Sequence, residues 1–217
     1  MAYPTVDKPY GLKPINLIGG QPYAGSTRLM SIASGYGTDI FYGDVVKRVS
    51  NGTIEKDTGT STATPIGIFM GCTFTNPVTK QKQFTQSWPA GTIASDAQAY
   101  VVDDPDVLFK VVTVSSGTTV AFYGPNLVGE NAVLVQNAGS NTTGDSAVGI
   151  FGGNTATTAS FPIRIVDIVP DTGNGSNGYC EFICKFNAPY VTISVNLAGA
   201  NTATVTGGHQ YLNPTGV

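Results

Sequence analysis

Four prolines in the first 25 residues constrain this chain more than any other sequence feature: Pro4, Pro9, Pro14 and Pro22. Proline fixes φ, lacks a backbone donor and keeps the preceding residue extended, so this segment cannot form a helix or a central strand. It is nevertheless too rich in apolar and aromatic residues for a solvated tail. We therefore predict an extended arm over residues 1–25, whose reach of about 80 Å, at ~3.3 Å per residue, is enough to cross a neighbouring subunit.

Six residues of this arm are the predicted contacts with a neighbouring subunit or another protein. They are Tyr10, Leu12, Pro14, Ile15, Leu17 and Ile18. We expect the stretch from Gly11 to Ile18 to add to a sheet edge of the partner, with its larger side chains as anchors. On this interpretation, a chain lacking residues 1–20 still folds but no longer binds its partner.

Composition narrows the classes of partner. Only 12% of the residues are charged, against about 25% in an ordinary soluble domain. The net charge of −3 and the pI near 4.9 argue against a nucleic-acid groove, which requires a basic stripe. No stretch approaches the ~20 apolar residues of a membrane span, and the N-terminus lacks the features of a secretory leader. We expect a protein that is made in the cytoplasm, or released from it without a secretory leader, and that binds neither nucleic acid nor membrane.

The rest of the chain reads as β-strands separated by turns. Apolar residues alternate in Ile66–Phe74, where Ile66, Ile68, Met70, Cys72 and Phe74 are predicted to share one face. Alternation also places Cys180, Phe182, Cys184 and Phe186 inside, with Glu181 and Lys185 outside. Weaker strands are expected at Arg28–Ala33, Asp39–Val49, Ala99–Asp103, Val107–Val114, Thr118–Tyr123, Ala132–Gln136, Ala147–Phe151 and Phe161–Val169.

Many short strands at this spacing predict an all-β fold, an antiparallel β-sandwich or barrel-like domain. We assign this domain to residues 26–190, followed by a C-terminal strand and tail over residues 191–217. In that extension Val191, Ile193, Val195 and Leu197 alternate with polar residues, and a second strand is possible at Ala203–Thr206. A short helix is expected at most around Thr92–Ala97.

The residues that often carry chemistry give no convincing site. His209, the single histidine, follows two glycines and is expected to be a solvated tail residue. Asp103-Asp104-Pro105-Asp106 predicts a polar turn, because it lacks the glycine and distal glutamate of a calcium loop. The three cysteines are expected to be buried free thiols, since Cys180 and Cys184 lie about 13 Å apart along one strand. We predict no catalytic residue, cofactor or metal, and therefore no enzyme.

Several short segments occur in an order typical of one family. These are Gly11-Leu12-Lys13-Pro14, Gly43–Val46, Val102–Phe109, Thr143–Ser146, Ile163–Val169 followed by Asp171–Asn174, and Phe182–Asn187. In these elements the chain resembles the head-decoration, or cement, proteins of tailed bacteriophages, most specifically at Asp103–Phe109. The chain continues beyond the last match, and the family's frequent histidine after that match is absent.

The resemblance implies a homotrimer on the outer surface of the expanded head, at three-fold positions. There it would bind the major capsid protein and stabilise the shell against the pressure of packaged DNA, after assembly in the host cytoplasm. The alternative function is a glycan-binding module on the virion surface or for host attachment. That alternative needs exposed aromatic residues, for which Tyr36, Tyr42, Trp88 and Tyr100 are the candidates.

Overall fold

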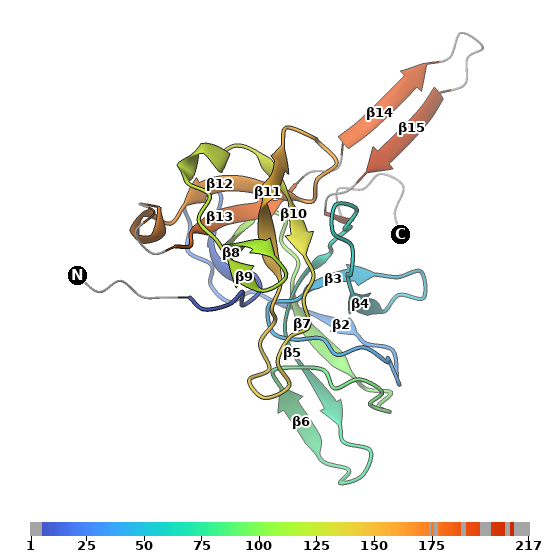
Figure 1. Ribbon diagram of the computed structural model, residues 1–217. Coiled ribbons are helices and arrows are strands. Elements are labelled where there is room, and N and C mark those ends of the chain that lie inside the picture. Colours follow the sequence, from blue (N-terminus) through green and yellow to red (C-terminus); the bar gives the residue numbers. More distant parts are fainter. Residues whose placement is uncertain are drawn as a thin grey trace.

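The computed structural model describes residues 6–173, 175, 178–187, 190–195, 201–206, 209 and 210. They form an all-β fold, as predicted, with two single-turn 3₁₀ segments (Figure 1). The strands are β1 (Lys13–Leu17), β2 (Arg28–Ser31), β3 (Val45–Arg48), β4 (Ile54–Lys56), β5 (Gly67–Thr75), β6 (Lys82–Thr85), β7 (Gln98–Val102), β8 (Val107–Ser116), β9 (Thr119–Val120), β10 (Asn131–Val135), β11 (Gly149–Ala156), β12 (Ile163–Ile168), β13 (Glu181–Phe186), β14 (Tyr190–Val195) and β15 (Asn201–Thr206). The 3₁₀ segments are η1 (Pro125–Leu127) and η2 (Pro170–Thr172).

A closed β-barrel forms one part of the molecule. Its strands follow the order β8-β11-β10-β12-β13, and β13 pairs with β8 to complete the ring. All these pairs are antiparallel except β8–β11. The predicted inward alternation in β13 is confirmed, because Phe182, Cys184 and Phe186, with the preceding Cys180, belong to the barrel core. Closure leaves these five strands no free edge along the ring.

The second part is an open sheet in the order β2-β7-β5-β3-β4, with β6 paired to the end of β5. In Figure 1 this sheet lies below the barrel, and the β5–β6 hairpin extends farthest from it. One of its faces has a core of its own, which includes Phe69, Cys72, Phe74 and Trp88. The opposite face meets the barrel core through Ile68 and Val102.

The predicted shared face from Ile66 to Phe74 is wrong in one respect. Ile68 packs into the barrel core and Met70 against it, whereas Cys72 and Phe74, like Ile66 just before β5, pack into the core of the second sheet. The pairing of β5 with β7 shifts register between Phe69 and Cys72, and Gly71 within that interval has φ 123°. An extra residue in a strand reverses the side to which all later residues point.

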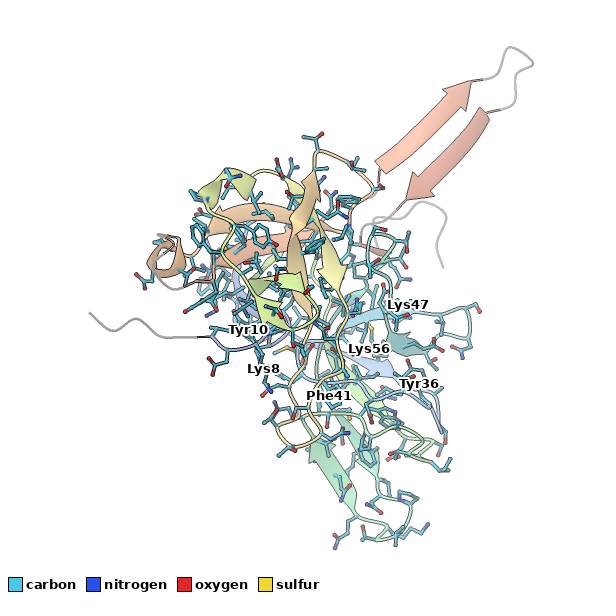
Figure 2. All side chains as sticks on the ribbon, in the orientation of Figure 1. Lys8, Tyr10, Tyr36, Phe41, Lys47 and Lys56 are labelled. Carbon is cyan, nitrogen blue, oxygen red and sulfur yellow. The ribbon has the colours of Figure 1, made fainter. Side chains whose placement is uncertain are left out.

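A buried ion pair of the second sheet is linked by a hydrogen bond to the segment that precedes the barrel strand β11. The Asp44 carboxylate is fully buried and lies 2.9 Å from Lys56 Nζ. It also accepts hydrogen bonds from Ser146 Oγ, at 2.6 Å, and from the backbone N–H of Phe41, at 2.9 Å. Figure 2 shows Lys56 and Phe41 close together at this junction. Both oxygens of the buried carboxylate thereby have a donor within the protein.

Part of the predicted arm belongs to the domain. β1 pairs antiparallel with β8 of the same chain and shifts register between Pro14 and Asn16. It is an edge strand, the position at which proline is tolerated. The boundary at residue 25 therefore separates segments that share a sheet, and loss of residues 1–20 would uncover the barrel. The short helix considered possible at Thr92–Ala97 does not form, and these residues are an irregular loop with a turn at Ser95-Asp96.

The C-terminal extension contains the predicted strand and its possible partner. β14 and β15 pair with each other antiparallel in a separate two-stranded sheet; the predicted position Leu197 lies outside the described residues. The prediction for His209 is wrong: its side chain is fully buried and its ring centroid lies 5.8 Å from that of Phe186. The three cysteines are free and buried, as expected.

Candidate functional site

The six predicted contact residues divide into internal and exposed positions. Leu12 is fully buried in the barrel core, and Leu17 packs against that core. Pro14 and Ile15 are half-buried on β1, whereas Ile18 is 51% exposed. Leu12 therefore cannot anchor a neighbour as expected. The sequence reasoning missed this because an apolar arm does not reveal that its own domain offers β8 as a partner edge.

Tyr10 also contacts its own domain. Its hydroxyl donates a hydrogen bond to the carboxylate of the buried Glu181, whose other close partner is Lys110 Nζ at 3.3 Å. Burial, and then this hydrogen bond to Glu181, raise the pKa of Tyr10 well above its usual range. Glu181, predicted to face outward, is thus covered by the arm. Figure 2 shows Tyr10 at the start of the chain, below the barrel.

An exposed apolar surface lies on the second sheet, where that sheet extends beyond the barrel. Register pairs Leu29 with Tyr100 and Thr73 with Phe84, which gives these residues one common face opposite the buried Met30 and Ala99. Leu29 is 55% exposed and Phe84 is 72% exposed. We call this surface, made of Leu29, Met70, Phe84 and Tyr100, the outer face.

A shallow groove of about 450 Å³ crosses the outer face. Its lining comprises Tyr42, Met70, Gly71, Cys72, Phe84, Thr85, Gln86 and Tyr100. Gly71 gives part of the floor, where a Cβ atom would approach the carbonyl oxygen of Thr85 to 2.9 Å. The groove is mainly aromatic and apolar in its walls, a composition typical of the centre of an interface or of a ligand site.

Polar groups border the groove at one end. The Asp145 carboxylate lies 3.3 Å from Lys13 Nζ and accepts a hydrogen bond from Gln86 Nε2 at 3.1 Å. Lys13 Nζ also lies 4.0 Å from the centroid of the Tyr42 ring. Burial, followed by the nearby Asp145 charge, raises the pKa of Tyr42, so this phenol stays neutral at physiological pH.

The β5–β6 hairpin presents a further apolar side chain beside the outer face. Val78, in the turn, is 85% exposed. Asn76 Oδ1 accepts hydrogen bonds from the backbone N–H groups of Val78 and Thr79, at 2.8 and 3.0 Å. The turn is therefore held in a defined conformation. Sequence analysis missed β6, because a strand of four residues with a single apolar member, Phe84, carries no alternation.

The other residues considered for chemistry have structural roles. Asp103 lies 2.8 Å from Arg28, and Asp104 Oδ1 accepts from the backbone N–H of Asp106 at 2.9 Å, which confirms the predicted turn. Within the described residues, no three His, Cys, Asp or Glu side chains gather as a metal site. Trp88 is fully buried, and Tyr36 accepts a hydrogen bond from the backbone of Lys56, so Tyr42 and Tyr100 are the predicted aromatic residues that line the groove.

The comparisons with known proteins give no relative for this chain. No protein-family model, no curated protein and no solved structure matches it. Among the described residues there is also no helix with the length and apolar character needed to span a bilayer.

Proposed function

We propose that this chain is a structural virion protein that decorates and cements the head of a tailed bacteriophage. In this proposal a homotrimer binds the major capsid protein on the outer surface of the expanded head, at three-fold positions. It stabilises the shell against packaged DNA and carries out no catalysis. The observation that supports it best is the outer face, which exposes two large apolar side chains beside two half-buried ones.

The chemistry of the outer face suits a protein partner. Aromatic residues and methionine are enriched at the centres of protein interfaces, whereas lysine and glutamate are depleted there. Leu29, Met70, Phe84 and Tyr100 provide such a centre, and Asp145 with Gln86 provides a polar border. The resemblance to the decoration proteins, at Asp103–Phe109 and in the other segments that follow the family's order, favours a capsid protein as that partner. Several copies of a modest contact around a three-fold axis would bind a shell with high avidity.

The structure changes which residues we assign to the shell contact. Of the six arm residues first predicted, Tyr10 and Leu12 contact their own domain, and Ile18 is the most exposed. We therefore assign the main contact to Leu29 and Phe84 on the outer face, with Ile18 as an additional contact.

Co-sedimentation with capsid shells of the encoding phage, unexpanded and expanded, tests this function. We expect binding to expanded shells at a saturating ratio near three copies per three-fold site, and a large loss of binding for Leu29→Ser/Phe84→Ser. Ile93→Ser is the matched control, because Ile93 is 65% exposed but lies in the loop that covers the opposite face. Failure of the unmodified chain to bind either shell would overturn the proposal.

A glycan-binding role is the second candidate, and the groove is the observation that favours it. Tyr42 and Tyr100 line the groove, and the Asp145 carboxylate at its border is an acceptor for sugar hydroxyl groups. A glycan array separates the two functions. Binding that Tyr100→Ala abolishes, without any shell binding, would favour the glycan role.

A further inference from the structure

The C-terminal extension is attached to the domain at both ends of its hairpin. The backbone N–H of His209 donates to the carbonyl oxygen of Asn187 at 3.1 Å, so the chain returns to the point where it left the barrel. The next residue, Gln210, bonds through its side chain to the backbone N–H and C=O of Arg48, at 2.6 and 3.0 Å. Its own N–H donates to Pro65 at 2.8 Å. These contacts fix the base of the hairpin.

The hairpin itself pairs with nothing else in the described part of the chain. β14 and β15 share six register pairs, from Tyr190–Thr206 to Val195–Asn201, and neither joins the barrel or the second sheet. Figure 1 shows them projecting from the body. A single two-stranded hairpin is at best marginally stable in water. A projecting hairpin whose base is fixed would therefore gain stability from contact with a surface outside its own domain.

The residue pattern of the hairpin is two-sided. Register pairs Val191 with Val205 and Ile193 with Ala203, so these positions lie on one side of the two-stranded sheet. Threonine and serine occupy most of the alternate positions, with Tyr190 opposite Thr206 at the base, and Asn201 is the polar member of the apolar side, opposite Val195. The two strands contain no proline and no charged residue. Proline, lysine and other charges are the means by which natural edge strands avoid pairing with other chains.

The charge distribution indicates which partner fits. No Asp, Glu, Lys or Arg occurs from Phe186 to the C-terminus, although the preceding chain carries both signs of charge. Near the axis of a cyclic assembly, identical residues of the copies approach one another, and like charges there destabilise the contact. An uncharged hairpin meets a copy of itself without that repulsion.

We propose that the β14–β15 hairpin is a self-association element, whose apolar positions pack against the same hairpin in other copies of this chain. In a cyclic assembly, each hairpin then gains neighbours and the bodies remain free to bind elsewhere. This inference deepens the proposed function, since it names the element that joins the proposed trimer. Self-association is measured without any capsid shell, so this inference and the proposed function can fail independently.

The close approach of Asn187 and His209 allows a clean deletion. We would replace residues 188–208 by an Asn-Gly turn, which connects adjacent backbone segments with little strain. Light scattering after size exclusion and sedimentation velocity then measure the mass of both chains over a range of concentrations. We expect the full chain to form an oligomer and the shortened chain to be a monomer with an unchanged unfolding transition of the body.

A pair of point variants keeps the test independent of the deletion. Ile193→Asp adds a charge at an apolar position, and Thr192→Asp adds the same charge to the opposite side of the same strand. We expect Ile193→Asp to weaken association at least about tenfold, with a smaller effect of Thr192→Asp. A full chain that is monomeric at high micromolar concentration overturns the inference. So does an oligomer that persists in the shortened chain, or equal effects of the two aspartates.

Discussion

The barrel and the second sheet differ in whether their strands have free edges. The barrel strands close into a ring, and the core inside them includes Phe109, Phe182 and Phe186. The second sheet stays open, and the four most exposed large apolar side chains of the described residues all belong to it or to its loops: Leu29, Val78, Phe84 and Ile93. Closure supports the stability of a fold, whereas an open sheet leaves a face for contacts. We infer that this chain separates stability from recognition.

The largest expected effect is on the free energy of unfolding, and it distinguishes two phenylalanines. Phe182 is fully buried in the barrel, and Phe84 is mostly exposed on the outer face. Phe182→Ala should reduce the free energy of unfolding by about 3–5 kcal/mol, because it removes apolar contacts and leaves a cavity. Phe84→Ala should change it by only about 0.5 kcal/mol or less. Urea unfolding measures both, and similar losses for the two variants would contradict the separation of roles.

A second expected effect concerns the attachment of the arm to the barrel. Tyr10→Phe removes the hydroxyl that donates to the buried Glu181, and it should cost about 1–3 kcal/mol of unfolding free energy. Tyr23→Phe is the matched control. The Tyr23 hydroxyl donates to the Ser26 carbonyl in an exposed turn, at 2.8 Å, so its loss should cost much less. Equal, small effects would mean that Tyr10 does not hold the arm to the domain.

The sequence predicted most strands correctly where alternation was regular. Cys180 to Phe186 is the clearest case, since every second residue enters the barrel core. Alternation failed at Gly71, because a single bulged residue reverses the pattern and glycine carries no side chain to show it. The barrel closure between β8 and β13 depends on residues about 70 positions apart, and no local pattern encodes such pairing.

The candidate site was less predictable than the fold. The arm was correctly identified as extended, but the partner edge for β1 is supplied by β8 of the same chain. The outer face arises only when β2, β7, β5 and β6 are placed side by side, and the short β6 has little sequence signal. His209 follows two glycines, so local sequence could not indicate that Phe186 and the chain near Pro65 would bury it.

The rates at which thiol reagents modify the cysteines measure how readily each region opens. Cys72 lies in β5 beside the short, terminal β6, whereas Cys180 and Cys184 lie in the barrel. Burial raises the pKa of the Cys72 and Cys184 thiols, so labelling of either requires local opening. We expect thiol reagents to modify Cys72 at least about tenfold faster, a difference of ~1.4 kcal/mol in opening free energy. Peptide mapping by mass spectrometry measures each rate, and three equal rates would indicate that both regions open together.

The smallest expected effect is a pH dependence at the site where the C-terminal extension returns to the barrel. Burial lowers the pKa of His209, and the nearby Asp103 and Asp104 charges act in the opposite direction. The unfolded chain binds a proton near pH ~6.5, whereas the folded chain does so only at lower pH, so acidification below that value favours unfolding. The non-titrating His209→Gln should therefore lose less stability than the unmodified chain between about pH 7.5 and about pH 5.5. Other titrating groups, including Asp57 with its raised pKa, are common to both proteins and cancel in the comparison. Parallel pH profiles would show that the histidine is not held neutral by burial, and the extension would then be attached to the barrel less firmly than its contacts indicate.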